Sequence, residues 1–157
     1  MWRIFCVIME KTCFEKDKYK ERKIAMKLLV AYDEDTLSSK VLNQAMKRAK
    51  ESDAYVFLVH TLDSDTKGEE FLKWEKRLNE IQEELFEKNG IKSEFHIMVR
   101  GLSPGEDIVK FAAQKDVDEI LIGIKKRSRV GKLMFGSTAR YVILESHCPV
   151  LTVNSTK

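Results

Sequence analysis

The chain has 157 residues, of which 43% are hydrophobic and 34% are charged, and this composition indicates one soluble globular domain. All of its net charge of +3 comes from residues 1–25, so the remainder is electrically balanced and we expect the domain to bind no nucleic acid. No run approaches the ~20 apolar residues of a membrane span, and three scattered cysteines (Cys6, Cys13 and Cys148) form no disulfide framework, which predicts a cytoplasmic protein without a membrane partner.

Residues 1–25 form an N-terminal extension that differs in pattern from the rest of the chain. They show no clean helical or strand period, whereas an apolar run begins abruptly at residue 27. Two hypotheses stay open for this extension. Either Met26 is the natural start, because residues 20–22 can be encoded by a ribosome-binding sequence, or the extension is a genuine disordered or docking tail. We place one domain at residues 26–154.

The first half of the domain alternates apolar runs with helical patterns. Residues 27–32 form a short apolar run that ends at a turn signal of three carboxylates, which predicts a buried strand. Apolar residues at every third or fourth position predict a helix over residues 36–52 and a second over 69–88. Between these helices, a second apolar run predicts a strand over residues 54–62.

The second half continues the alternation. Strands are predicted over residues 94–99, 119–124 and 150–153. Helices are predicted over residues 106–114, capped by Ser103 or Gly105, and from Gly136 or Ser137 to about residue 146. A basic loop over residues 125–132 separates the fourth strand from the last helix.

Strands that alternate with helices predict a parallel sheet covered on both faces. The predicted fold class is α/β: a three-layer, doubly wound sandwich with a five-stranded parallel sheet in the order 3-2-1-4-5. Such a sheet binds ligands at the carboxyl ends of its strands, where the winding direction reverses. That point lies between strands 1 and 4, which end near Asp33 and at Gly123.

The segment from Gly123 to Thr138 carries the most informative chemistry. It runs from a strand end, through a loop, to a helix that Gly136 or Ser137 opens. A glycine lets a ligand approach the backbone closely, and a helix N-terminus offers a phosphate free N–H groups and a positive dipole end. The alternative is a plain glycine turn with a serine cap. The sequence contains neither a P-loop nor a G-x-G-x-x-G fingerprint.

The pattern G-x2-G-x9-G-[ST] after strand 4, followed by a helix and a C-P-V-L-x-V strand, resembles the universal stress proteins. The resemblance extends over residues 26–153, and it implies an adenine nucleotide alpha hydrolase-like fold that binds ATP, with or without Mg²⁺, at the switch point. Carried over position by position, it implies these nucleotide-binding residues: Ala31, Tyr32, Asp33, Thr61, Gly101, Ile122, Gly123, Lys126, Arg127, Gly136, Ser137 and Thr138.

Lys126 stands where the family pattern has its second glycine. Its side chain could block the close approach of a phosphate to the backbone, or its charge could bind that phosphate. Four other basic residues surround it, and the resulting cluster comprises Lys125, Lys126, Arg127, Arg129 and Lys132. A solvated charged loop is a further interpretation of this cluster.

The remaining candidates are weaker. We expect His60 and His96 to be strand-end or surface histidines rather than ligands, and Trp74 to belong to the core. We predict no metal site in the protein itself, apart from a contact of Asp33 with a magnesium nucleotide. No residue other than Asp33 is a candidate general base, so we expect no catalytic residues and at most slow ATP hydrolysis.

Two functions are left open by the resemblance. It implies an ATP-binding stress-response or regulatory protein that acts through a nucleotide-dependent conformation or partner interaction. The alternative is a dimeric interaction module in which Lys126 has abolished nucleotide binding. In both cases strand 150–153 is the expected edge for a homodimer or a higher homo-oligomer. An adenylating ligase on the same broad fold is disfavoured, because its Ser-Gly-Gly and His-x-Gly-His signatures do not occur.

Overall fold

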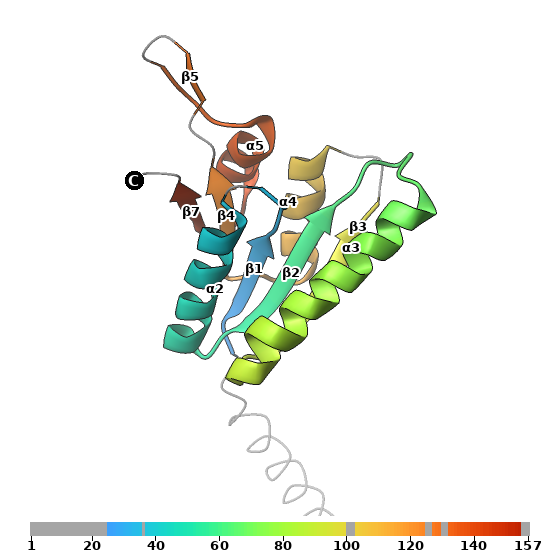
Figure 1. The fold of residues 1–157 in the computed structure, drawn as a ribbon. Helices are drawn as coiled ribbons and strands as arrows, with labels where there is room; N and C mark the ends of the chain where they lie inside the picture. The colour runs from blue at the N-terminus through green and yellow to red at the C-terminus, as the bar shows by residue number, and fades with distance from the viewer. Residues whose placement is uncertain (1–24, 36, 100–102, 125–126, 130–131, 155–157) are drawn as a thin grey trace, which may run out of the picture.

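A computed structural model describes residues 25–35, 37–99, 103–124, 127–129 and 132–154. Its centre is a sheet of five parallel strands in the spatial order β3-β2-β1-β4-β7 (Figure 1). These strands are β1 (Lys27–Ala31), β2 (Tyr55–Thr61), β3 (Ser93–Met98), β4 (Glu119–Ile124) and β7 (Val150–Asn154). Numbered along the chain, the order is 3-2-1-4-5, which confirms the predicted fold class. The proposed extension, residues 1–25, lies outside the described residues except for its last one.

Helices cover both faces of the sheet (Figure 1). One face carries α2 (Ser38–Ser52) and α3 (Gly68–Ile81), and the other carries α4 (Pro104–Gln114) and α5 (Ser137–Glu145). Successive residues of β1 divide between the two cores, because Leu28 and Val30 face α2 and α3 while Leu29 faces α4 and α5. Burial on both faces explains why this run is continuously apolar.

The start of α4 shows how the sequence sets a helix boundary. The Ser103 side chain accepts a hydrogen bond from the Glu106 amide, and the Glu106 carboxylate accepts one from the Ser103 amide at 2.9 Å. This reciprocal capping box confirms Ser103, rather than Gly105, as the cap. The helix begins two residues earlier than predicted, because Pro104 is well suited to the first helical position.

The end of α3 differs from the single long helix that the sequence predicts over residues 69–88. The α-helix ends at Ile81, and a π-helical turn (Gln82–Phe86) and a 3-10 turn (Glu87–Asn89) come after it. The wider π turn accompanies complete burial of the Phe86 side chain. Gly90 then ends the segment in the left-handed region at φ 72°, a conformation that favours glycine.

The segment predicted as a basic loop contains a small hairpin instead. Strands β5 (Arg127–Arg129) and β6 (Lys132–Met134) pair antiparallel, and the hairpin projects from the body of the domain (Figure 1). The prediction was wrong here because three-residue strands are too short to show an alternating pattern. The two residues between the strands lie outside the described ones.

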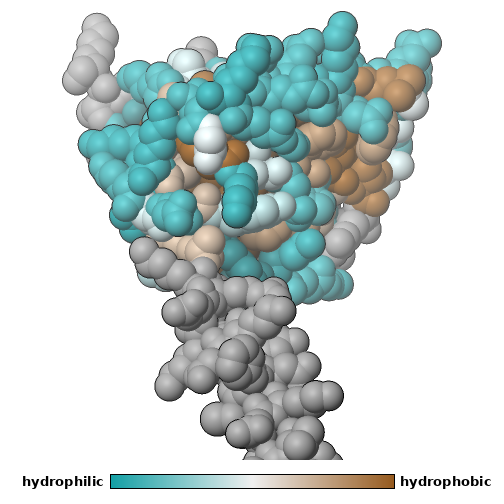
Figure 2. All heavy atoms as spheres, turned by 90° about the horizontal axis from the view of Figure 1, so that it is seen from below, coloured by the Kyte–Doolittle hydropathy of each residue, from teal (hydrophilic) through white to brown (hydrophobic). Residues whose placement is uncertain are grey.

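The surface at the amino ends of the strands is largely hydrophilic. Figure 2 views this end from below, and the hydrophobic residues on it gather toward one side. Within the described ranges, none of the helices combines the length and the apolar character needed to cross a bilayer. This agrees with the hydropathy of the sequence.

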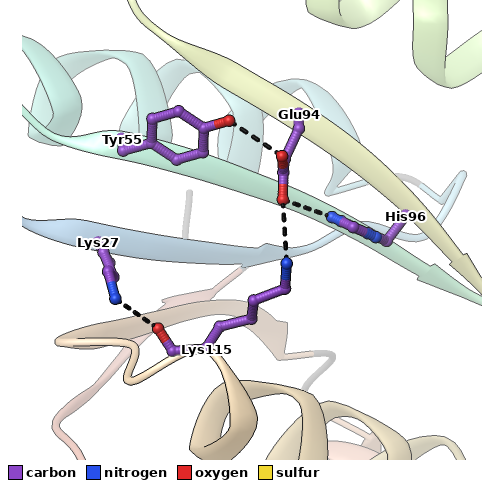
Figure 3. A network of polar contacts seen from close by, with 5 residues as sticks. All are labelled: Lys27, Tyr55, Glu94, His96 and Lys115. Atoms are coloured by element: carbon purple, nitrogen blue, oxygen red, sulfur yellow. Dashed lines mark hydrogen bonds and ion pairs between the residues drawn. The ribbon is translucent and has the colours of Figure 1, made fainter.

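A polar network joins β2, β3 and α4 near the same end (Figure 3). The Glu94 carboxylate accepts a hydrogen bond from the Tyr55 hydroxyl at 3.0 Å and lies 2.7 Å from Nε2 of His96. Nζ of Lys115 lies 3.5 Å from the same carboxylate. Partial burial alone would raise the pKa of Glu94, but the hydrogen bonds from His96 and Tyr55 outweigh it and lower this pKa. The Lys27 side chain donates to the Lys115 carbonyl at 2.7 Å, which completes the end of α4.

The two-sided core leads to a stability prediction. Leu58, in the middle of β2, is fully buried, so Leu58→Ala should lower the free energy of unfolding by about 2–5 kcal/mol. Leu72→Ala is the matched control, because Leu72 is 62% exposed and its truncation should change stability by less than about 0.5 kcal/mol. Urea unfolding followed by circular dichroism measures both values. Equal losses in the two variants would contradict the assignment of the core.

Candidate functional site

A cleft of about 970 Å³ opens at the carboxyl ends of the strands. It is lined by the residues at the ends of β1, β2 and β4, by the loop after β2, and by the first residues of α4 and α5. The chain winds from β1 outward through β2 to β3, and later returns on the other side of β1 as β4 and β7. The cleft therefore lies at the switch point of the sheet, where doubly wound folds bind ligands.

The structure brings most of the predicted site residues to this one cleft. Nine of the twelve line it: Ala31, Tyr32, Asp33, Thr61, Ile122, Gly123, Gly136, Ser137 and Thr138. Gly101 and Lys126 lie outside the described residues. Arg127 begins β5, and its side chain is likewise not described.

Gly123 lines the cleft near the end of β4, but packing within the protein also requires it. A Cβ at this position would lie 3.1 Å from Cγ2 of Val41 and 3.7 Å from the Leu37 side chain, both on the α2 side of the sheet. From the sequence alone, this glycine is explained by the approach of a ligand. The structure adds the close packing of α2 against β4 as a second physical reason.

Gly136 is different, because neither its backbone nor its neighbours require a glycine. It caps the N-terminus of α5 with φ −61°, and a Cβ there would meet nothing within 4 Å. No side chain caps this helix, so the first amides of α5, which begins at the cleft lining, have no capping hydroxyl or carboxylate. Ser137 and Thr138 add two hydroxyls beside them. Such a terminus has the donors and the dipole that an anion needs.

An aromatic stack that the sequence patterns did not predict forms another part of the cleft. The rings of His60 and Trp74 lie 3.5 Å apart between centroids at an angle of 23°, and both line the cleft. Nδ1 of His60 lies 3.0 Å from the carbonyl oxygen of Tyr32. Because a carbonyl oxygen only accepts, Nδ1 carries a proton, and Nε2 of the neutral ring is an acceptor.

The environment of His60 also sets its protonation. Its side chain is only 6% exposed, and burial lowers the pKa of the imidazole although the bond to Tyr32 and the carboxylate of Asp33 act in the opposite direction. A signal for the stack was present in the sequence. Trp74 precedes the buried Leu78 and Ile81 by four and seven residues, which places it on the inward stripe of α3.

Carboxylates dominate the charge of the described lining. The lining contains a single lysine, Lys67, and five acidic residues: Asp33, Asp35, Asp63, Asp65 and Glu70. Like charges repel phosphate oxygens, so an anionic group is favoured at the α5 end, where the lining consists of glycine, hydroxyl and small apolar residues. Within the described part of the chain, no group of three or more His, Cys, Asp or Glu residues could hold a metal ion.

Comparison with known proteins gives consistent matches over this domain. The model of the universal stress protein family matches residues 25–154. Universal stress protein MJ0531 of Methanocaldococcus jannaschii is 30% identical over 142 residues, which cover 83% of each chain.

Solved structures show the same likeness. A universal stress protein from Archaeoglobus fulgidus is 35% identical with a TM-score of 0.72, covering 85% of this chain and 97% of the other. The universal stress protein from the same organism in complex with dAMP is 33% identical with a TM-score of 0.66, covering 82% of this chain and 98% of the other.

The lowered pKa of His60 leads to a pH prediction. The folded state resists protonation of this imidazole more than the unfolded chain does, so the neutral ring contributes stability that is fully present above about pH 6.5. That contribution is lost as the pH falls through the folded pKa. Chemical unfolding of wild type and His60→Phe between pH 7.5 and 5 should therefore show a smaller loss of stability in the variant. Parallel pH profiles would contradict the assignment, and an NMR titration of the imidazole gives the folded pKa directly.

Proposed function

The chain belongs to the universal stress protein family, and from this premise we propose that it binds an adenine nucleotide in the cleft between β1 and β4. One observation carries the proposal: three segments of the chain meet at this cleft. They are the end of β1 with Asp33, the end of β4 with Gly123, and the N-terminus of α5 with Ser137. The first offers a carboxylate and the last offers free amides, so one elongated ligand can place a base at one end and an anion at the other.

The orientation of the nucleotide follows from the charges of the lining. The base and ribose carry amino and hydroxyl donors, which suit the carboxylate of Asp33 and the other acidic residues on the β2 side. The phosphates suit the start of α5, where Gly136 leaves open space. The Archaeoglobus fulgidus relative in complex with dAMP supports an adenine nucleotide as the ligand class. ATP with Mg²⁺ fits the same scheme, because the metal offsets repulsion from the nearby carboxylates.

The proposed role is regulatory rather than catalytic. Nucleotide binding would select one conformation or one partner in a stress response, in the cytoplasm, with hydrolysis at most slow. Asp33 is the sole candidate general base named from the sequence, which is why we propose that hydrolysis is slow. Binding energy at this site would therefore serve a shift in population rather than bond breaking.

A second candidate is the dimeric interaction module without nucleotide. Lys126 in place of the motif glycine favours it, and so does apolar surface near the sheet edge. Strand β7 is an edge strand, and Ile143 and Leu144 on neighbouring α5 are 40% and 67% exposed. Pairing of two β7 strands across a two-fold axis would cover this edge in a homodimer. Such a dimer is compatible with either function.

The open space at Gly136 provides a direct test of phosphate binding. Gly136→Ala should change the free energy of unfolding by no more than about 1 kcal/mol, because the methyl group meets no atom within 4 Å. It should weaken ATP binding at least about tenfold if phosphate oxygens occupy that space. Gly68→Ala is the matched control, since it adds a methyl group in equally open space at the start of α3, at a residue that does not itself line the cleft. Calorimetric titration with ATP and Mg²⁺ measures both, and equal affinities in the two variants would contradict the proposal.

Lys126 separates the two candidate functions. If its side chain obstructs the phosphates, Lys126→Gly should strengthen ATP binding, and if its charge is used, the same change should weaken binding by about tenfold. The same titration measures the effect. Lys92→Gly is the matched control, because Lys92 is exposed just before β3 and does not line the cleft. An unchanged affinity in Lys126→Gly would show that this part of the loop does not touch the ligand.

A further inference from the structure

One wall of the cleft makes few buried contacts with the rest of the domain. We call residues 62–77, which comprise the loop after β2 and the first turns of α3, the β2–α3 wall. Seven of its residues line the cleft. From residue 68 to residue 77, every side chain is exposed except that of Trp74, which is half-buried. The residues of α3 that belong to the core begin only at Leu78.

Trp74 is the contact that holds this wall against the body. Its indole stacks on the His60 ring at 3.5 Å between centroids, and it meets the edge of Tyr32 at 6.3 Å and 78°. His60 is itself held by the 3.0 Å contact of Nδ1 with the Tyr32 carbonyl. Both partners are buried at the ends of the central strands. The stack thus joins an exposed helix start, which has few buried contacts, to buried residues at the ends of β1 and β2.

The other interactions that hold the β2–α3 wall to the domain are weak or local. Arg77 Nε lies 3.6 Å from a Glu34 carboxylate oxygen, but both side chains are nearly half exposed, so water screens this ion pair. The amide of Leu62 donates to the Met98 carbonyl at 2.8 Å and anchors the start of the wall. The wall is therefore fixed at Leu62, fixed again from Leu78 onward, and held between these points chiefly by Trp74.

The indole also has room to leave its place. Trp74 also lines a second hollow of about 180 Å³, together with Glu34 and charged residues of α3. These neighbours are long, flexible side chains that can give way without disturbing the core. A ring that borders both the cleft and this hollow can rotate out of the stack, and the exposed helix start can move with it.

We infer that Trp74 is a positioning residue that latches the β2–α3 wall against His60, and that release of this latch opens the cleft for ligand entry and exit. The latch itself follows from the packing of the wall. The identity of the ligand, an adenine nucleotide, rests on the proposed function. Segments that move during binding belong to the parts of a protein with the lowest local stability, and loops of this kind often set the rates of ligand exchange.

Hydrogen exchange on the full-length, ligand-free protein tests the latch without any ligand. In Trp74→Ala, amides of residues 64–77 should exchange at least about tenfold faster than in wild type, while β1 and β4 should change much less. Trp74→Phe keeps an aromatic ring and should restore most of the protection. Leu72→Ala removes an exposed side chain of the same wall and should match wild type. Unchanged exchange in Trp74→Ala, or an equal acceleration in β1 and β4, would overturn the inference.

Stopped-flow binding of ATP with Mg²⁺ then separates a latch from a simple ligand contact. Release of a latch should raise both the association and the dissociation rate constants of Trp74→Ala at least about threefold, so that affinity changes less than either rate. An increase in dissociation alone would show that Trp74 only contacts the ligand, and would overturn its role as a latch. If wild type binds no ATP, the proposed function fails, and the exchange experiment alone decides the latch.

Discussion

The site depends on the position of β1 between two strands that belong to opposite halves of the chain. Val30 pairs in parallel with Leu58 of β2 on one side and with Leu121 of β4 on the other. Because all three strands run the same way, their carboxyl ends meet at one edge of the sheet. The connections leave that edge in opposite directions, toward α2 and α3 and toward α5, and a cleft is left between them. The order of the strands therefore produces the cleft, and the side chains at the strand ends determine its chemistry.

Two glycines of the motif illustrate how packing and ligand binding share the same residues. Gly123 is needed inside the protein, because a side chain there would press on Val41 and Leu37. Gly136 has no such internal reason, since its backbone angles are ordinary and the space around it is empty. A phosphate bound at the start of α5 would explain why a glycine stands at this position. The acidic residues on the β2 side of the cleft would repel phosphates, and so would favour the same orientation of the proposed nucleotide.

Sequence patterns predicted the elements whose signals are local or periodic. The apolar run of β1 and the helix cap, for which Ser103 was one of two candidates, both follow from short-range chemistry. The π turn at the end of α3, the hairpin after β4 and the stack of His60 on Trp74 do not, because each depends on how distant segments or very short strands come together. At the site, strand order located the cleft and nine of the predicted residues line it, whereas the β2–α3 wall was missed because its polar loop has no motif of its own.

Nucleotide content of the purified wild-type protein tests the central claim most directly. The folded protein would be denatured, the supernatant separated by anion exchange, and nucleotide-free protein then titrated with ATP and Mg²⁺ in a calorimeter. We predict a retained adenine nucleotide, or a saturable heat of binding at one site per chain. A folded protein that neither retains nor binds adenine nucleotide would contradict the claim, and would leave the dimeric interaction module as the function of this fold.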